Sequence, residues 1–125
     1  MRLTVLHVDD EADIREVAAM ALEMDPELHV LSAASGRDAL TVLETDARVD
    51  VIRLDVMMPE LDGPATLEKL RKLPAHARTP VIFMTARAQS HELDRFLSLG
   101  ALAVIIKPFD PMTLAQHLRD HLASA

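Results

Sequence analysis

The 125-residue sequence predicts an α/β fold with a doubly wound, five-stranded parallel sheet. Two observations predict it. Short apolar runs alternate five times with stretches whose apolar residues recur at helical spacing. The runs are also apolar along most of their length, which is typical of strands buried on both faces. Right-handed crossovers join such strands, so we expect a (βα)5 three-layer sandwich built as one domain, residues 1–125.

Five runs rich in Val, Ile and Leu have the length and composition of strands. Proline and glycine residues separate them from the helical stretches. In chain order the predicted strands are residues 3–8, 29–33, 49–54, 80–85 and 101–106.

Each predicted strand is followed by a stretch with one apolar face at the period of a helix. These faces would cover the two sides of the sheet. They are formed by Ile14, Val17, Ala18, Ala21 and Leu22; Ala39, Leu40 and Leu43; Leu67 and Leu70; Leu93, Phe96 and Leu97; and Leu114, Leu118 and Leu122.

The composition excludes several classes of protein. The chain has no cysteine, so it has neither disulfides nor thiolate metal sites. No apolar run approaches the roughly 18 residues of a membrane span, and the N-terminus does not resemble a secretory signal. The net charge of −7 argues against direct binding of nucleic acid. We therefore expect a soluble cytoplasmic protein with no membrane partner.

Polar residues close four of the five predicted strands. Because ligands bind at the carboxyl ends of parallel strands, these residues are expected to converge on one site. They are Asp9, Asp10 and Glu11 after the first strand, Asp55 after the third, Thr85 at the end of the fourth and Lys107 after the fifth.

This set of groups suits phosphoryl transfer. Crowded carboxylates bind Mg²⁺, which prefers one or two carboxylates, waters and a phosphate. Asp55 would be the nucleophile and would form an aspartyl phosphate. The metal, Lys107 and the Thr85 hydroxyl would hold the oxygens of the transferred group. Taken singly, Asp9 and Asp10 would also suit a helix cap, Thr85 an ordinary strand end and Lys107 a solvated lysine.

Four segments, "VLHVDDE", "VIRLDVMMPELDG", "PVIFMTA" and "VIIKPF", resemble the signature segments of the response-regulator receiver domain, in order and spacing. The resemblance covers essentially the whole chain. It implies the flavodoxin-like strand order 2-1-3-4-5 and a role in two-component signalling or a phosphorelay. The chain ends soon after its last predicted helix, so it resembles a stand-alone, chemotaxis-type regulator, unless an output domain has been removed.

The resemblance also assigns roles to residues. Asp55 resembles the phosphoacceptor, and Thr85 the switch hydroxyl. The other expected site residues contact the metal or the phosphoryl group or form a cis peptide bond. Asp9, Asp10 and the backbone carbonyl of Met57 would bind Mg²⁺. Ala86 and Lys107 would contact the phosphate. The peptide bond Lys107–Pro108 would be cis.

In the family, a sensor histidine kinase or a phosphotransfer protein supplies the phosphoryl group from a phosphohistidine. The receiver catalyses its own modification and then signals to a protein partner, which the sequence does not identify. Met57 and Arg87 flank the expected site, where the family tunes loss of the phosphate. The expected kinase-docking residues are Ile14, Arg15, Pro108 and Phe109.

Val104 departs from the family pattern, which has Tyr or Phe at this position. Without a ring, the usual link between the switch hydroxyl and the surface is lost. Three readings remain: a switch that moves the fourth helix without an aromatic partner, a phosphate sink or relay, and a weakly responsive, degenerate domain.

Arg53 is the second departure, because the family normally has an aliphatic residue there. Strand alternation puts it on the face of Val51 and Asp55, about 7 Å from Asp55. An unpaired buried guanidinium is costly, so we predict that Arg53 reaches a carboxylate or a carbonyl oxygen, or extends past a helix end. Pairing with Asp55 itself would compete with the metal.

Three other classes of protein share part of this pattern. A haloacid-dehalogenase-like phosphatase also uses an aspartate nucleophile, Thr or Ser, Lys and Mg²⁺, but its nucleophile follows the first strand in an Asp-x-Asp arrangement. A flavodoxin-like cofactor binder requires a phosphate loop that is lacking after residues 3–8. A pseudo-receiver would keep the fold without being phosphorylated.

Overall fold

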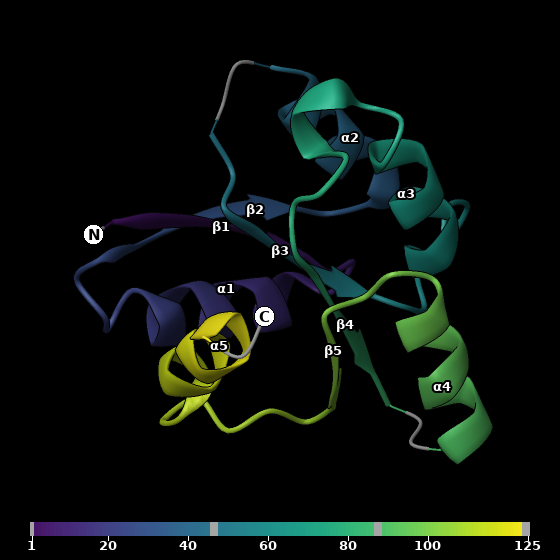
Figure 1. Cartoon of the computed structure of the whole chain (residues 1–125). Coiled ribbons are helices and arrows are strands. Elements are labelled where there is room, and N and C mark those ends of the chain that lie inside the picture. The colour runs from purple at the N-terminus through teal and green to yellow at the C-terminus, as the bar shows by residue number, and fades with distance from the viewer. Residues whose placement is uncertain (1, 46–47, 87–88, 124–125) are drawn as a thin grey trace.

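The computed structural model describes residues 2–45, 48–86 and 89–123. These residues form five strands and five α-helices in regular alternation (Figure 1). In chain order the elements are β1 (Leu3–Val8), α1 (Ala12–Leu22), β2 (Leu28–Ala33), α2 (Gly36–Glu44), β3 (Val51–Asp55), α3 (Gly63–Leu70), the 3-10 turn Pro74–His76, β4 (Val81–Thr85), α4 (Ser90–Ser98), β5 (Ala103–Ile106) and α5 (Leu114–Ala123).

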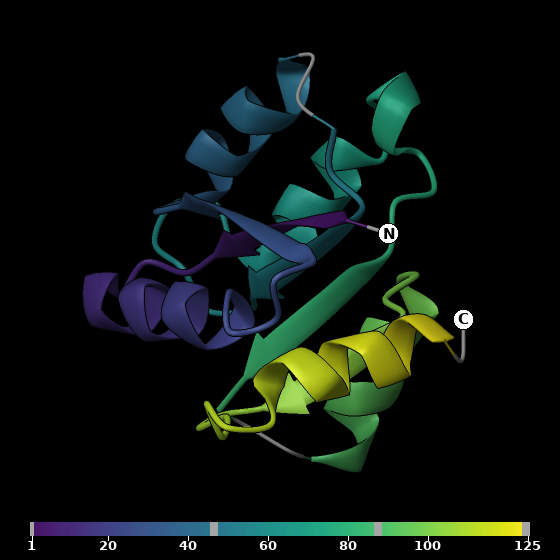
Figure 2. The same cartoon turned by 90° about the vertical axis from the view of Figure 1, so that its left-hand side faces the viewer.

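The strands form one parallel sheet in the order β2-β1-β3-β4-β5, which confirms the predicted fold class and strand order. β1 and β3 lie side by side at the centre, and His7 is paired with Arg53. Helices α1 and α5 cover one face of the sheet, and α2, α3 and α4 cover the other (Figures 1 and 2). The structure is therefore the expected three-layer sandwich.

Two aliphatic cores fill the spaces between the layers. Strand residues with even numbers in β1 and β3, such as Leu6 and Ile52, join the larger core. Their odd-numbered neighbours Val5 and Val51 join the core beneath α1 and α5. This alternation is the period of a strand, so neighbouring residues face opposite helical layers.

The strand and helix bounds differ slightly from the sequence predictions. β3 begins two residues later than predicted and includes Asp55, and β5 begins at Ala103. Two residues expected on buried helix faces are exposed, Val17 by 42% and Leu97 by 47%. Among the described residues, no helix is long and apolar enough to cross a bilayer.

The segment between β3 and α3 brings a helix end close to Asp55. Asp62 caps α3, because its Oδ1 accepts a hydrogen bond from the backbone N–H of Ala65 at 2.9 Å. The N–H of Gly63 donates to the carbonyl of Val56 at 2.9 Å. A Cβ on Gly63 would stand 2.7 Å from the Asp55 carbonyl oxygen and 2.9 Å from the Val56 Cα. Glycine is therefore required by the close approach of two backbone segments.

The variant Gly63→Ala should lower the free energy of unfolding by about 1–3 kcal/mol, because backbone atoms must shift to admit the methyl group. Urea unfolding followed by circular dichroism measures the change. Pro64→Ala is the matched control: it adds no atom at this contact and should cost less than about 1 kcal/mol. Equal stability of Gly63→Ala and the wild type would contradict the close approach.

Candidate functional site

Three carboxylates meet at the carboxyl edge of the central strands. Asp9 follows β1, and Asp55 is the last residue of β3. One oxygen from each of Asp9, Asp10 and Asp55 lies within 4.8 Å of the others. Asp9 and Asp55 are buried and Asp10 is exposed, so the cluster opens to solvent on one side. Hard carboxylate oxygens at this spacing suit Mg²⁺, so the residues present fit the metal.

Asp9 is held in place from several directions. Its Oδ1 accepts a hydrogen bond from the backbone N–H of Glu11 at 2.9 Å. Its backbone carbonyl accepts one from Nη1 of Arg15 at 2.7 Å. These contacts orient Asp9 at the point where β1 turns into α1.

Lys107 connects the acids to the fifth strand. Its Nζ donates to Oδ2 of Asp9 at 3.0 Å and lies 3.2 Å from Oδ2 of Asp55. The Lys107–Pro108 peptide bond is cis. One ammonium group therefore contacts carboxylates from β3 and from the end of β1.

The environment shifts the pKa values of both partners. Burial raises the pKa of Asp55, and Lys107 opposes that rise. For Lys107, burial alone would lower the pKa, but the hydrogen bond to Asp9 and the charges of Asp55 and Asp9 outweigh it and raise the pKa. Lys107 therefore carries a positive charge at neutral pH.

The remaining predicted site residues surround this pair. Thr85 is buried at the end of β4, and Ala86 is exposed directly after it. Met57 is 69% exposed, and its backbone contributes a hydrogen bond to Asp55. Arg87, expected to flank the site, lies outside the described residues.

Three of the four predicted docking residues, Ile14, Pro108 and Phe109, line one groove beside the acids. A mainly apolar groove of about 350 Å³ is lined by residues that include Ile14, Lys107, Pro108 and Phe109. Arg15 does not line it and instead donates to Asp9. The groove thus lies between α1 and the segment that follows β5.

Val104 is half-buried in β5, where it is paired with Phe83 and packs against the larger core. A ring contact exists close by between Phe83 and Phe96 of α4, with centroids 5.3 Å apart and planes at 62°. The aromatic packing on this face therefore joins β4 to α4.

The prediction for Arg53 is wrong. Arg53 is 0% exposed, and its Nη1 donates to Nδ1 of His7 at 3.2 Å. Among the described residues, its Nε and Nη2 have no hydrogen-bond partner, neither carboxylate nor carbonyl. The Asp55 carboxylate contacts Lys107 instead. Arg53 lies on the sheet face beneath α1 and α5, where the ring of Phe109 lies 5.3 Å from its Cζ.

Sequence reasoning missed His7. Burial, reinforced by the charges of Arg53, Lys107 and Arg15, lowers the pKa of His7 to about 3, so the ring is neutral at pH 7. Its Nδ1 accepts from Arg53, and its Nε2 has no hydrogen-bond partner among the described residues. A signal existed: His7 precedes Asp9 by two residues as Arg53 precedes Asp55, so strand alternation puts both on one face.

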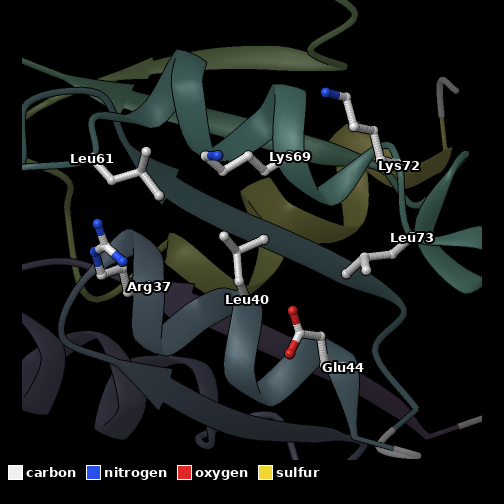
Figure 3. A pocket seen from close by; sticks show the side chains of 7 residues that line it. All are labelled: Arg37, Leu40, Glu44, Leu61, Lys69, Lys72 and Leu73. Atoms are coloured by element: carbon white, nitrogen blue, oxygen red, sulfur yellow. The ribbon is translucent and has the colours of Figure 1, made fainter.

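A second hollow, of about 400 Å³, lies between α2 and α3 (Figure 3). Arg37, Leu40 and Glu44 line it from α2, Lys69 lines it from α3, and Lys72 lines it from the segment after α3. Its lining mixes both charges with leucines and contains none of the residues that close the strands.

The fold and the site define a flavodoxin-like domain with an acid pocket and a lysine at its carboxyl edge. The family model for the response regulator receiver domain matches residues 5–119. CheY4 of Vibrio cholerae, a chemotaxis response regulator, is structurally similar, with a TM-score of 0.87 and 32% identity over 97% of this chain and 99% of that chain. The chain belongs to the response regulator receiver domain family.

Curated relatives agree with this assignment. The transcriptional regulatory protein YvrH of Bacillus subtilis is 34% identical over 95% of this chain and 48% of its own length. The response regulator SaeR of Staphylococcus epidermidis is 34% identical over 95% of this chain and 50% of its own length. The chain thus spans about half the length of these relatives. Membership of the receiver family removes the phosphatase and cofactor-binder alternatives.

His7 should make stability depend on pH. Its pKa is about 3 in the folded protein and about 6.5 when unfolded, so the neutral ring stabilises the fold above pH 6.5. That contribution is lost as the pH falls from 6.5 toward 3, at up to ~1.4 kcal/mol per pH unit. Urea unfolding between pH 7 and pH 5 measures the slope. His7→Gln, which keeps an acceptor for Arg53 but does not titrate, should have a shallower slope. Identical slopes would contradict the buried, neutral histidine.

Proposed function

We propose that this receiver domain accepts a phosphoryl group on Asp55. The observation that carries the proposal is the contact of Lys107 with Asp9 and Asp55 beside a third carboxylate, Asp10. A carboxylate oxygen of Asp55 attacks the phosphorus of a phosphohistidine whose other ring nitrogen carries a proton; the P–N bond breaks, its electron pair stays on the ring, and a neutral imidazole leaves. The domain promotes this transfer to itself and has no separate substrate to turn over.

Asp9, Asp10, Asp55 and the backbone carbonyl of Met57 would hold Mg²⁺. When bound, the metal offsets the negative charge of the carboxylates and of the incoming phosphoryl oxygens. The hard oxygen donors and their spacing within 4.8 Å support this role.

Lys107, Thr85 and Ala86 are assigned to the phosphoryl oxygens. Lys107 supplies a positive charge, and the hydroxyl of Thr85 and the backbone of Ala86 supply hydrogen bonds. Phosphorylation replaces a charge of −1 on Asp55 by roughly −2. Movement of Thr85 toward the new oxygens would shift an existing two-state equilibrium at α4, β5 and α5, with Val104 in place of an aromatic switch.

The donor is a sensor histidine kinase or a phosphotransfer protein. The groove lined by Ile14, Pro108 and Phe109 is the proposed docking surface, because it is apolar and borders Lys107. A donor histidine inserted there would stand close to Asp55. The downstream partner is a protein that distinguishes the two states, and YvrH and SaeR are regulators of about twice this length.

Incubation with acetyl phosphate and Mg²⁺ should add one phosphoryl group, detected by intact-mass spectrometry. Asp55→Asn should abolish the adduct, because an amide oxygen is not a nucleophile of comparable strength. Asp94→Asn, which removes an exposed carboxylate from α4, is the matched control and should be phosphorylated like the wild type. Removal of Mg²⁺ with a chelator should also prevent the adduct. A folded wild type that forms no adduct would be a pseudo-receiver.

The docking groove can be tested separately. Ile14→Asp puts a charge in the apolar groove and should slow transfer from a phosphorylated histidine kinase by about tenfold or more, since such a charge costs over 1 kcal/mol on docking. Phosphorylation by acetyl phosphate should be unchanged, because a small donor needs no docking surface. The kinase used is one that phosphorylates the wild type. Equal loss with both donors would indicate damage to the site itself and would contradict a docking role.

A further inference from the structure

Arg53 places a positive charge in the interior, directly below the acid pocket. The side chain is 0% exposed, and its contacts are the Nδ1 of His7 at 3.2 Å and the ring of Phe109 at 5.3 Å. Among the described residues, Nε and Nη2 have no hydrogen-bond partner. An apolar side chain would fill this position without leaving two nitrogens without hydrogen-bond partners, so packing alone does not account for an arginine.

The charge of Arg53 acts on the acid pocket through Asp9, whose negative charge opposes the lowering of the Arg53 pKa. Arg53 precedes Asp55 by two residues on the same strand face, a separation of about 7 Å along a strand. It is also paired across the sheet with His7, which precedes Asp9 by two residues. Burial lowers the pKa of Arg53 only to about 10, with Asp9 opposing, so the guanidinium stays charged at neutral pH. His7 is neutral and therefore adds no charge to the pocket.

Counting charges shows what Arg53 changes. Asp9, Asp10, Asp55 and Lys107 together carry a net charge of −2, which one divalent cation would neutralise. Arg15 and Glu11, which both contact Asp9, carry opposite charges and leave this sum unchanged. Arg53 leaves only one net negative charge, so Mg²⁺ in the resting pocket would produce an excess positive charge. An aspartyl phosphate adds about one further negative charge. With Arg53 present, the pocket is neutral when both the metal and the phosphoryl group are bound.

We propose that Arg53 is a built-in counter-charge that weakens Mg²⁺ binding by the resting pocket and strengthens retention of the phosphoryl group once the metal is bound. This inference rests on the proposed function of the same pocket. Because the guanidinium is in the core, dissolved salt screens it little, and the effect is carried through a low-dielectric interior.

The test compares Arg53→Met, which removes the buried charge at similar length, with Arg78→Met, which removes an exposed positive charge before β4. Isothermal titration calorimetry gives the dissociation constant for Mg²⁺ in the unphosphorylated protein. A second titration, at saturating Mg²⁺, gives the affinity for trifluoroberyllate, an anion of charge −1 that binds a carboxylate in tetrahedral geometry and so adds one negative charge, as phosphorylation does. Arg53→Gln serves as a second neutral variant, and circular dichroism establishes that each variant is folded.

The proposal predicts effects of opposite sign. In Arg53→Met and Arg53→Gln, Mg²⁺ should bind about tenfold more tightly and trifluoroberyllate about tenfold more weakly, the order of magnitude of one buried unit charge acting on the pocket. Arg78→Met should remain within about twofold of the wild type in both titrations, because the charge it removes is exposed and lies at the start of β4, away from the acids. Opposite shifts do not arise from simple damage to the fold.

Two results would overturn the inference while leaving the proposed function intact: neutral variants that bind both ligands like the wild type, and neutral variants that bind both more weakly, which would make Arg53 purely structural. A folded wild type that binds no Mg²⁺ would instead overturn the proposed function of the pocket, and the inference with it.

Discussion

The contact of one ammonium group with two buried carboxylates is the constraint on which the site depends. Parallel strands bring their carboxyl ends to one edge, so acids that end β1 and β3 must lie together there. Such a cluster is unfavourable without a cation. Lys107 supplies it from the end of β5, at 3.0 Å from Asp9 and 3.2 Å from Asp55. The contacts of Lys107 therefore fix the segment from Lys107 to Phe109 against both central strands. The groove beside α1, which this segment lines, consequently lies next to the carboxylates.

The two faces of the sheet differ in character. Beneath α2, α3 and α4 the core is aliphatic, with one aromatic pair, Phe83 and Phe96. Beneath α1 and α5 the core also contains His7 and Arg53, capped by Phe109. Phe109 therefore contacts the buried guanidinium on one side and lines the apolar groove on the other. The same ring therefore borders both the groove and the buried charge.

Local pattern was sufficient for most of the architecture. Apolar runs and helical periodicity predicted five strands within two residues of their observed bounds, because burial on both faces demands such runs. The local pattern did not predict exposure where exposure depends on neighbouring elements. Val17 and Leu97 lie at the spacing of an apolar helix face, but both are exposed. His7 was overlooked because the two-residue spacing that it shares with Arg53 indicates a contact only once β1 and β3 are known to be neighbours in register.

The sequence by itself determined the fold class, the edge at which the polar residues meet and the family, because strand alternation and the residues that close each strand are local features. Only the tertiary structure decided the environment of Arg53. A guanidinium two residues below a carboxylate was expected to find an oxygen. The helices α1 and α5 seal that face of the sheet, the Asp55 carboxylate contacts Lys107, and a neutral histidine and an aromatic ring are what remain within reach. That outcome depends on the packing of three distant segments, which no local pattern encodes.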